Sequence, residues 1–251
     1  MEPWFENKLD TKEIRKYTSS RIDKSSFEKI SNITRSYSLT TWLIIINIAV
    51  FIISFIAIGL TSPEKVFSFM AIQPNAFFSG TFWTLITSMF MHANLTHLFV
   101  NMLSLFFIGS FIERLIGRKR LFWLYMISGI VAGLFFVILA YQFGNTELGA
   151  KIFGSPEIYA VGASGAIFAL GGLLAVLTPN LRVYVFFIIP MKMWTAMIAL
   201  LFILWFASVG AGLPFGNTAH LGGLLVGLTY GIYLKNKYKR KTAIIRKYFS
   251  H

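Results

Sequence analysis

The sequence predicts an all-α polytopic membrane protein, a bundle of six transmembrane helices. Three observations support this fold class. Of the 251 residues, 56% are hydrophobic and only 13% are charged, whereas a soluble domain carries about 25% charged residues. The mean hydropathy is +0.66. Six separate apolar segments are each long enough to cross about 30 Å of hydrocarbon at about 1.5 Å per residue.

We expect the six segments to be helices because a segment that spans lipid must satisfy its own backbone hydrogen bonds. The sequence lacks the alternation of polar and apolar residues that is typical of membrane β-barrels. The first segment begins too far from Met1 for a cleaved signal peptide, so we expect it to be retained. The predicted spans lie at about residues 41–60, 93–113, 121–142, 158–178, 192–209 and 218–234.

The distribution of charge predicts the orientation. Basic residues gather in the turn Arg118–Arg120, in the loop that holds Arg182 and Lys192, and at both ends of the chain. Because Lys and Arg mark cytoplasmic loops, both termini are expected in the cytoplasm, which an even number of crossings allows. The net charge of +13 is therefore attributed to these loops and to contact with anionic membrane lipids, and no nucleic acid partner is expected.

The ends of the first and last predicted spans divide the chain into three parts. Residues 1–37 form a cytosolic N-terminal tail, residues 38–235 the membrane domain, and residues 236–251 a basic cytosolic C-terminal tail. We expect an integral protein of the plasma membrane of a prokaryote. The chain has no Cys, which excludes disulfides and thiolate chemistry.

The first outer loop, about residues 61–92, is apolar but broken. Pro74 and Gly80 interrupt any continuous helix there. Its many aromatic residues are of the kind that prefers the membrane interface. The sequence therefore predicts a structure that is partly embedded in the outer leaflet.

A serine and a histidine occur within apolar segments, where polar groups are costly and are usually functional. Ser164 stands in the stretch Gly162–Ala166, and His220 stands in the stretch Ala219–Gly223. Under the predicted topology, Ser164 is about six residues inside its helix, or roughly 9 Å deep. Asn101 is expected at a similar depth and His220 near the outer start of its helix, so that the three can meet.

These residue types suit acyl transfer. A serine nucleophile needs a base, usually His, and hydrogen-bond donors where the oxyanion develops. His97 and Asn101 are four residues apart and share one helix face, so both side chains can donate, as can the backbone N–H of Ser164. The sequence has no Asp after Asp23 and no well-placed Glu. It therefore predicts a Ser-His dyad whose orientation comes from packing and not from a carboxylate.

Small residues allow the helices that carry Ser164 and His220 to approach closely. Gly223 and Gly227 are four residues apart, as small residues on packed membrane helices commonly are. His92 lies at the entrance of the second span and is expected to tie down the outer loop. Glu113 and Arg114 are expected to be a structural pair or a clamp at a helix end.

Each of these polar residues also has a simpler interpretation. Ser164 can bond the backbone of its own helix and do nothing more, and His220 can be a packing histidine. His92, His97 and His220 are candidate metal ligands, but a spacing of five residues splays two helical side chains by about 140°, and no carboxylate joins them. We therefore expect no metal and no cofactor. The Gly-x-Ser-x-Gly elbow of soluble hydrolases is excluded because it requires a strand before the serine.

Taken together, four motifs in this order resemble the rhomboid family of intramembrane serine proteases, over about Ser38 to Lys235. The motifs are His92-x4-His97-x3-Asn101, Gly109-x3-Glu113-Arg114-x2-Gly117, Gly162-x-Ser164-Gly165 and Ala219-His220-x2-Gly223-x3-Gly227. The resemblance implies a rhomboid-type six-helix fold, with Ser164 as nucleophile and His220 as general base and then acid.

The resemblance also implies that His97 and Asn101 donate to the oxyanion and that Gly162 shapes the loop beside the serine. It implies that Gly210–Gly216 caps the site. Many members carry Trp-Arg in the outer loop, whereas Trp83 is followed here by Thr84; this departure concerns the anchoring of the loop and not the chemistry.

The expected function is that of an intramembrane endopeptidase that cleaves membrane-anchored proteins in or near their transmembrane segments. Substrates are expected to enter past the fifth span, with Trp205 and Phe206 as gate residues. The main alternative is a catalytically inactive rhomboid-like protein that binds membrane proteins. A transporter would need intramembrane carboxylates or broken helices, which are not evident, and hydrolysis of lipid acyl groups stays open. The oligomeric state is not predicted.

Overall fold

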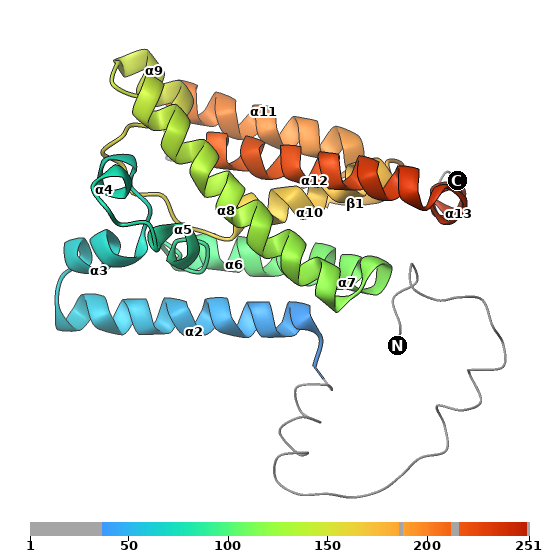
Figure 1. The fold of residues 1–251 in the computed structure, drawn as a ribbon, viewed down its shortest axis with the longest axis horizontal. Helices are drawn as coiled ribbons and strands as arrows, with labels where there is room; N and C mark the ends of the chain where they lie inside the picture. The colour runs from blue at the N-terminus through green and yellow to red at the C-terminus, as the bar shows by residue number, and fades with distance from the viewer. Residues whose placement is uncertain (1–36, 186–187, 212–215, 250–251) are drawn as a thin grey trace, which may run out of the picture.

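The chain, seen in a computed structural model, is described over residues 37–185, 188–211 and 216–249 and is mostly helical (Figure 1). A π-helical turn, η1 (Leu105–Gly109), joins α6 (Leu95–Ser104) to α7 (Ser110–Ile116). One short antiparallel hairpin pairs β1 (Arg182–Val185) with β2 (Ile189–Lys192). The helices are α2 (Leu39–Leu60), α3 (Pro63–Met70), α4 (Pro74–Phe78), α5 (Thr84–Thr87), α6 (Leu95–Ser104), α7 (Ser110–Ile116), α8 (Arg118–Phe143), α9 (Glu147–Phe153), α10 (Ser164–Leu177), α11 (Met193–Ala211), α12 (Asn217–Lys237) and α13 (Lys239–Tyr248).

Each of the six predicted apolar segments contains a helix. Four helical stretches are long and apolar enough to cross a membrane by length and composition, namely Leu39–Leu60, Leu95–Ile116, Arg118–Phe143 and Met193–Ala211, and α10 is a shorter apolar helix. The structure therefore supports an integral membrane protein of several helices. The count of six crossings stays a prediction.

The prediction for the fourth span was wrong at its start. The segment was expected to be helical from about residue 158, but α10 begins at Ser164. Residues before it are extended, since Ala160 forms a β-bridge with Ile72, and Gly162 has a φ of +123°, which ends any helical path. Ser164 is thus the first residue of its helix and not six residues inside it.

The all-α description also needs one correction, because the loop that holds Arg182 and Lys192 forms the β1–β2 hairpin. Val183, Tyr184 and Val185 are residue types that favour strands. Five described helices were not predicted: α3, α4 and α5 in the first outer loop, α9 in the loop after α8, and α13 in the basic C-terminal segment.

The first outer loop is broken into three short helices, in agreement with the predicted interruptions. Pro74 occupies the first turn of α4, and Gly80 has a φ of +118°, so both residues interrupt the chain where expected. The Nε1 of Trp83 donates to the carbonyl oxygen of Phe69 at 2.8 Å, and the buried Thr84 hydroxyl donates to the carbonyl oxygen of Thr81 at 2.6 Å. The loop is therefore anchored by local hydrogen bonds, while its depth in the bilayer stays a prediction.

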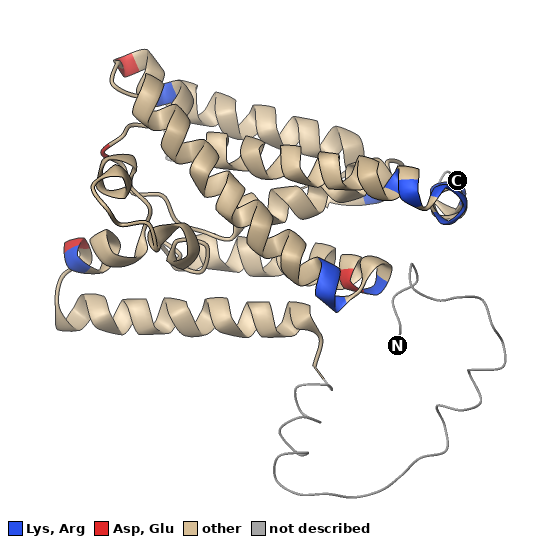
Figure 2. Cartoon of the chain, viewed as in Figure 1, with Lys and Arg blue, Asp and Glu red and all other residues tan. Residues whose placement is uncertain are grey.

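The short helix α10 forms the centre of the bundle. Most of its residues are buried, because small residues such as Gly165, Ala166 and Ala169 bring neighbouring helices close on several sides. By contrast, α2 lies at the edge, beside α3 and α6 (Figure 1). Lys and Arg gather mainly where α8 begins and α12 ends (Figure 2). The N-terminal tail, predicted as residues 1–37, lies almost entirely outside the described residues.

Candidate active site

The backbone before α10 places Ser164 at the start of that helix. The N–H of Gly162 donates to the carbonyl oxygen of Ser88 at 2.8 Å, which ties this segment to the outer loop. A Cβ at Gly162 would lie 2.8 Å from the His97 ring and 3.8 Å from the Ser164 hydroxyl oxygen. Only glycine therefore fits here, both for the positive φ and for the space.

His220 reaches Ser164 from α12. The Nε2 of His220 lies 2.8 Å from the Oγ of Ser164, within hydrogen-bond distance. The imidazole is buried, and it stacks on Phe168 of α10 with a centroid distance of 4.4 Å and an interplanar angle of 13°. At this distance, a neutral imidazole can take up the hydroxyl proton.

The other ring nitrogen of His220, Nδ1, is buried and has no hydrogen-bond partner among the described residues. A carboxylate in that position would accept from Nδ1–H and orient the ring. In this structure the Phe168 ring covers one face of the imidazole instead. Packing is thus the visible source of its orientation.

Glycines hold α10 against α12. A Cβ at Gly223 would collide with the carbonyl oxygen of Gly165, and a Cβ at Gly227 would collide with that of Ala169. The two helices therefore pack backbone to backbone, as the spacing of small residues predicted. This close approach brings the side chains of residues 164 and 220 together.

His97 and Asn101 lie on α6, on the side of the site toward Gly162. The Asn94 side chain accepts from the N–H of His97 at 2.8 Å and caps α6. The buried Asn101 amide donates to the carbonyl oxygen of His97 at 2.9 Å. The His97 ring adjoins Gly162, so this imidazole faces the segment that precedes the serine.

His92 precedes α6 and is buried beside His97, with a centroid distance of 5.1 Å between the rings. Burial and the nearby His97 lower the pKa of His92 to about 4, so its ring is neutral at pH 7. Its Nδ1 lies 3.3 Å from the carbonyl oxygen of Phe90, two residues earlier, so this contact stays within the end of the outer loop, and the contact of His92 with α6 is that between the two rings. Among the described residues, no group of three His, Cys, Asp or Glu could hold a metal ion.

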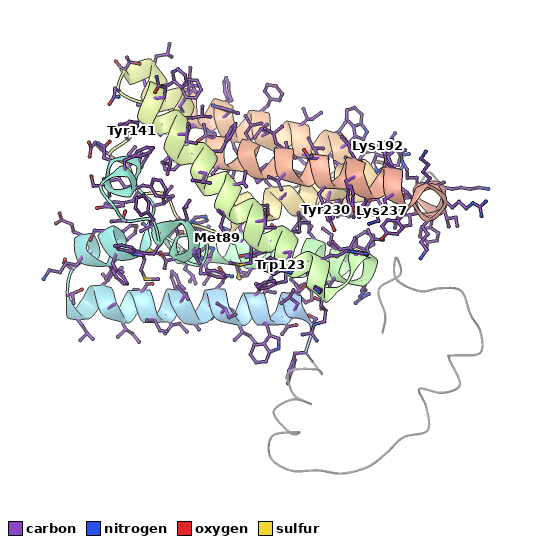
Figure 3. The ribbon with its side chains drawn as sticks, in the orientation of Figure 1. Met89, Trp123, Tyr141, Lys192, Tyr230 and Lys237 are labelled. Atoms are coloured by element: carbon purple, nitrogen blue, oxygen red, sulfur yellow. The ribbon has the colours of Figure 1, made fainter. Side chains whose placement is uncertain are left out.

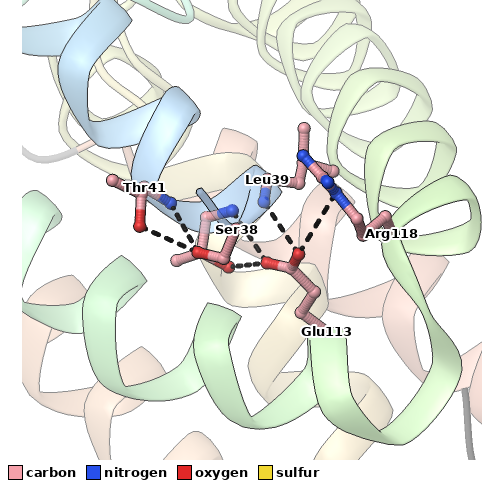
Figure 4. A network of polar contacts seen from close by, with 6 residues as sticks. Ser38, Leu39, Thr41, Glu113 and Arg118 are labelled. Atoms are coloured by element: carbon pink, nitrogen blue, oxygen red, sulfur yellow. Dashed lines mark hydrogen bonds and ion pairs between the residues drawn. The ribbon is translucent and has the colours of Figure 1, made fainter. Parts of the chain in front are cut away.

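Glu113 holds the start of α2 through hydrogen bonds (Figure 4). Its carboxylate accepts from the N–H of Leu39 at 2.7 Å and from the N–H and hydroxyl of Thr40, both at 2.8 Å. Arg118 lies 3.6 Å from the same carboxylate. Arg114, its predicted companion, is exposed.

The predicted gate residues differ in their surroundings. The Nε1 of Trp205 donates to the carbonyl oxygen of Ile152 at 2.9 Å and joins α11 to α9, whereas Phe206 is 81% exposed. Most of the predicted cap, residues 212–215, lies outside the described residues.

The sequence interpretation missed two residues of this site. Phe168 stacks on His220, and its position four residues after Ser164 places it on the same helix face, a spacing that could have identified it. Ser88 accepts from Gly162, and nothing in the local sequence indicates that long-range contact.

Comparison with known proteins agrees with the geometry. The model of the Rhomboid domain family matches residues 79–237. The chain is similar to Rhomboid protease AarA of Providencia stuartii, with 32% identity over 224 residues, 82% of this chain and 76% of that protein. It is 29% identical to Rhomboid protease GluP of Bacillus subtilis over 194 residues, 76% of this chain and 33% of that protein.

A mitochondrial relative is also similar. Rhomboid protein 1 of Saccharomyces cerevisiae is 32% identical over 162 residues, which are 63% of this chain. The match spans 43% of that yeast protein. The chain thus corresponds to less than half of this relative.

Proposed function

The chain belongs to the rhomboid family, and we propose that it is an intramembrane serine endopeptidase that uses Ser164 and His220. The observation that carries the proposal is the distance of 2.8 Å between the Ser164 Oγ and the His220 Nε2. A serine and a histidine at this distance match the pairing of nucleophile and base in serine hydrolases.

In the proposed reaction, the Ser164 oxygen attacks the substrate carbonyl while His220 takes the hydroxyl proton. The protonated imidazole then gives this proton to the leaving amine, and a water molecule cleaves the acyl-enzyme with His220 again as base. Stacking of His220 on Phe168 supports a dyad that is oriented by packing.

Three donors are proposed for the oxyanion. Ser164 is the first residue of α10, so its N–H is not needed within the helix. The Asn101 amide uses one of its two N–H groups on His97, and the other can serve the oxyanion. The His97 ring beside Gly162 is the third.

We further propose six crossings, with α10 and α12 as the two that length and composition alone do not indicate. Both termini are assigned to the cytoplasm, the membrane domain to residues 38–235, and the chain to the plasma membrane of a prokaryote. The absence of Cys makes this testable, because the single-cysteine variants Glu64→Cys, Lys119→Cys and Lys151→Cys can be treated from outside with an impermeant maleimide. Labelling at 64 and 151 but not at 119 is expected, and the reverse pattern contradicts the topology.

The proposed substrates are membrane-anchored proteins, cut within or beside a transmembrane segment. A helical carbonyl is hydrogen-bonded within its helix, so substrate segments weakened by Gly or Pro are favoured. Lateral entry past α11 is supported by the exposed Phe206 and the partly buried Trp205 in the C-terminal half of that helix. We also propose that the segment Gly210–Gly216 forms a cap over the active site.

A fluorophosphonate probe tests the nucleophile directly. The wild-type protein in detergent should be labelled, Ser164→Ala should abolish labelling, and His220→Ala should reduce it by roughly a hundredfold or more. Ser110→Ala on α7 is the matched control and should label like the wild type. Unchanged labelling of Ser164→Ala contradicts the assignment, and an unlabelled but folded wild type favours the inactive binding protein.

A second experiment separates a protease from a lipid hydrolase. The purified protein is incubated in liposomes with a single-span protein, and both peptides and lipids are identified by mass spectrometry. Cleavage within or beside the span, lost in Ser164→Ala, supports the protease. Release of fatty acid without peptide cleavage favours lipid acyl hydrolysis.

A further inference from the structure

A narrow groove runs along the outside of the bundle between α8 and α12, away from Ser164. It consists of two adjoining cavities of about 420 and 400 Å³ that share Val226 and Tyr230. The first is lined mainly by apolar side chains, including Val131, Phe135 and Leu225. The second extends the groove to Lys119 and Arg120, at the start of α8.

The groove exists because α8 and α12 diverge along their length (Figure 1). At one end they are in backbone contact, since a Cβ at Gly222 would lie 3.3 Å from the Cα of Ala132. At the other end long side chains bridge them, with the Arg120 Nη2 donating to the Tyr238 hydroxyl at 3.1 Å. The two helices are thus in direct contact at the apolar end and farther apart at the basic end, where these side chains span the gap.

The basic end of the groove is rich in cations and aromatic side chains. Lys119 is exposed, and Trp123 beside it is 54% exposed. Lys237, which lines neither cavity, donates from its ammonium to the hydroxyl of Tyr233 at 2.8 Å, and Tyr233 lines the first cavity. Figure 3 shows Trp123 on α8 and Tyr230 and Lys237 on α12 at this end of the bundle. The sequences of α8, α12 and α13 contain no acidic residue, so the charge that these helices bring to the groove is positive.

We propose that this α8–α12 groove binds an anionic phospholipid, with an acyl chain in the apolar part and the phosphate at Lys119 and Arg120. The groove joins an apolar slot to a cationic end, and the combination complements a lipid that has both parts. Trp and Tyr are the side chains that prefer the level of lipid headgroups, and they surround the cationic end.

The size of the groove favours a flexible chain over a protein helix. A helix about 10 Å wide with a pitch of about 5.4 Å fills on the order of 400 Å³ per turn. Either cavity would therefore enclose only about one helical turn, so that a docked transmembrane helix would lie mostly outside the groove. A single acyl chain can follow a narrow slot over its whole length.

Native mass spectrometry of the full chain tests the charged end. Phosphatidylglycerol should bind more tightly than phosphatidylcholine to the wild type. Lys119→Gln should weaken the binding of the first phosphatidylglycerol by about fivefold, the effect of one cation near a lipid surface. Lys192→Gln is the matched control, because Lys192 lies at the same end of the bundle but outside the groove (Figure 3); it should leave that binding unchanged.

The apolar part is tested separately with Val226→Trp, which fills the region shared by the two cavities. This change should weaken the binding of both lipids, whereas Phe202→Trp on the exposed face of α11 should weaken neither. Equal losses in Lys119→Gln and Lys192→Gln would mean diffuse surface attraction and would overturn the proposal. Unchanged binding in Val226→Trp, or a dimer mass in place of bound lipid, would overturn it as well.

Discussion

Replacement of Glu113 by Gln should loosen α2 from the bundle. In the wild type, both carboxylate oxygens accept backbone donors, one from Leu39 at 2.7 Å and one from Thr40 at 2.8 Å. Glutamine has the same shape, but one of its two terminal atoms is an NH2 group that cannot accept. One backbone N–H at the start of α2 is therefore left without this acceptor.

The expected cost follows from these contacts. The Glu113 side chain is only 10% exposed and Thr40 is 1% exposed, so water replaces the lost acceptor poorly. An orphaned donor costs about 1–3 kcal/mol, and removal of a negative charge from a helix N-terminus adds about 0.3–1 kcal/mol, which together make about 1–4 kcal/mol. For a chain of this length, that lowers the melting temperature by on the order of 10 °C.

Thermal unfolding in a mild detergent, followed by tryptophan fluorescence, measures the effect. Glu147→Gln is the matched control, since Glu147 is exposed and bonds Lys151, four residues away, which lowers the pKa of its carboxyl. We expect no measurable change in the melting temperature of that variant. If Glu113→Gln has the same melting temperature as Glu147→Gln, the carboxylate does not hold α2 and the reasoning is wrong.

Three further predictions concern the site. Gly162→Ala should lower both the melting temperature and the rate of fluorophosphonate labelling, because the residue has a φ of +123° and its Cβ would press on the His97 ring. The positive φ alone costs about 1–2 kcal/mol. A variant with the melting temperature and labelling rate of the wild type would refute this. Phe168→Leu should keep the fold but slow labelling about two- to tenfold, since stacking on His220 is worth about 0.5–1.5 kcal/mol beyond burial; a change in melting with no change in rate would show that Phe168 only packs. Gly223→Val should prevent the approach of α12 to α10, so we expect little monodisperse protein in gel filtration, and a folded, fully labelled variant would contradict the tight helix contact.

The class of fold and the two side chains that meet at the candidate site could be predicted from the amino-acid sequence. Hydrophobic content sets the membrane environment, since apolar segments of this length are stable only in lipid or a protein core. The spacing of Gly223 and Gly227 predicted close packing, and the backbone contacts with Gly165 and Ala169 confirm it. Family membership followed from motifs that are local in the chain, and the Rhomboid domain match confirmed it.

The local geometry of the site, by contrast, depends on contacts between distant segments and became visible only in the folded chain. The sequence placed Ser164 inside a long helix because residues 158–163 are largely apolar, but Gly162 and the pairing of Ala160 with Ile72 keep that segment extended. The contacts of Phe168 with His220 and of Glu113 with Thr40 likewise join separate helices. Hydropathy and spacing report which residues share a segment and a face, whereas partners from distant segments are selected by the packing of the whole bundle.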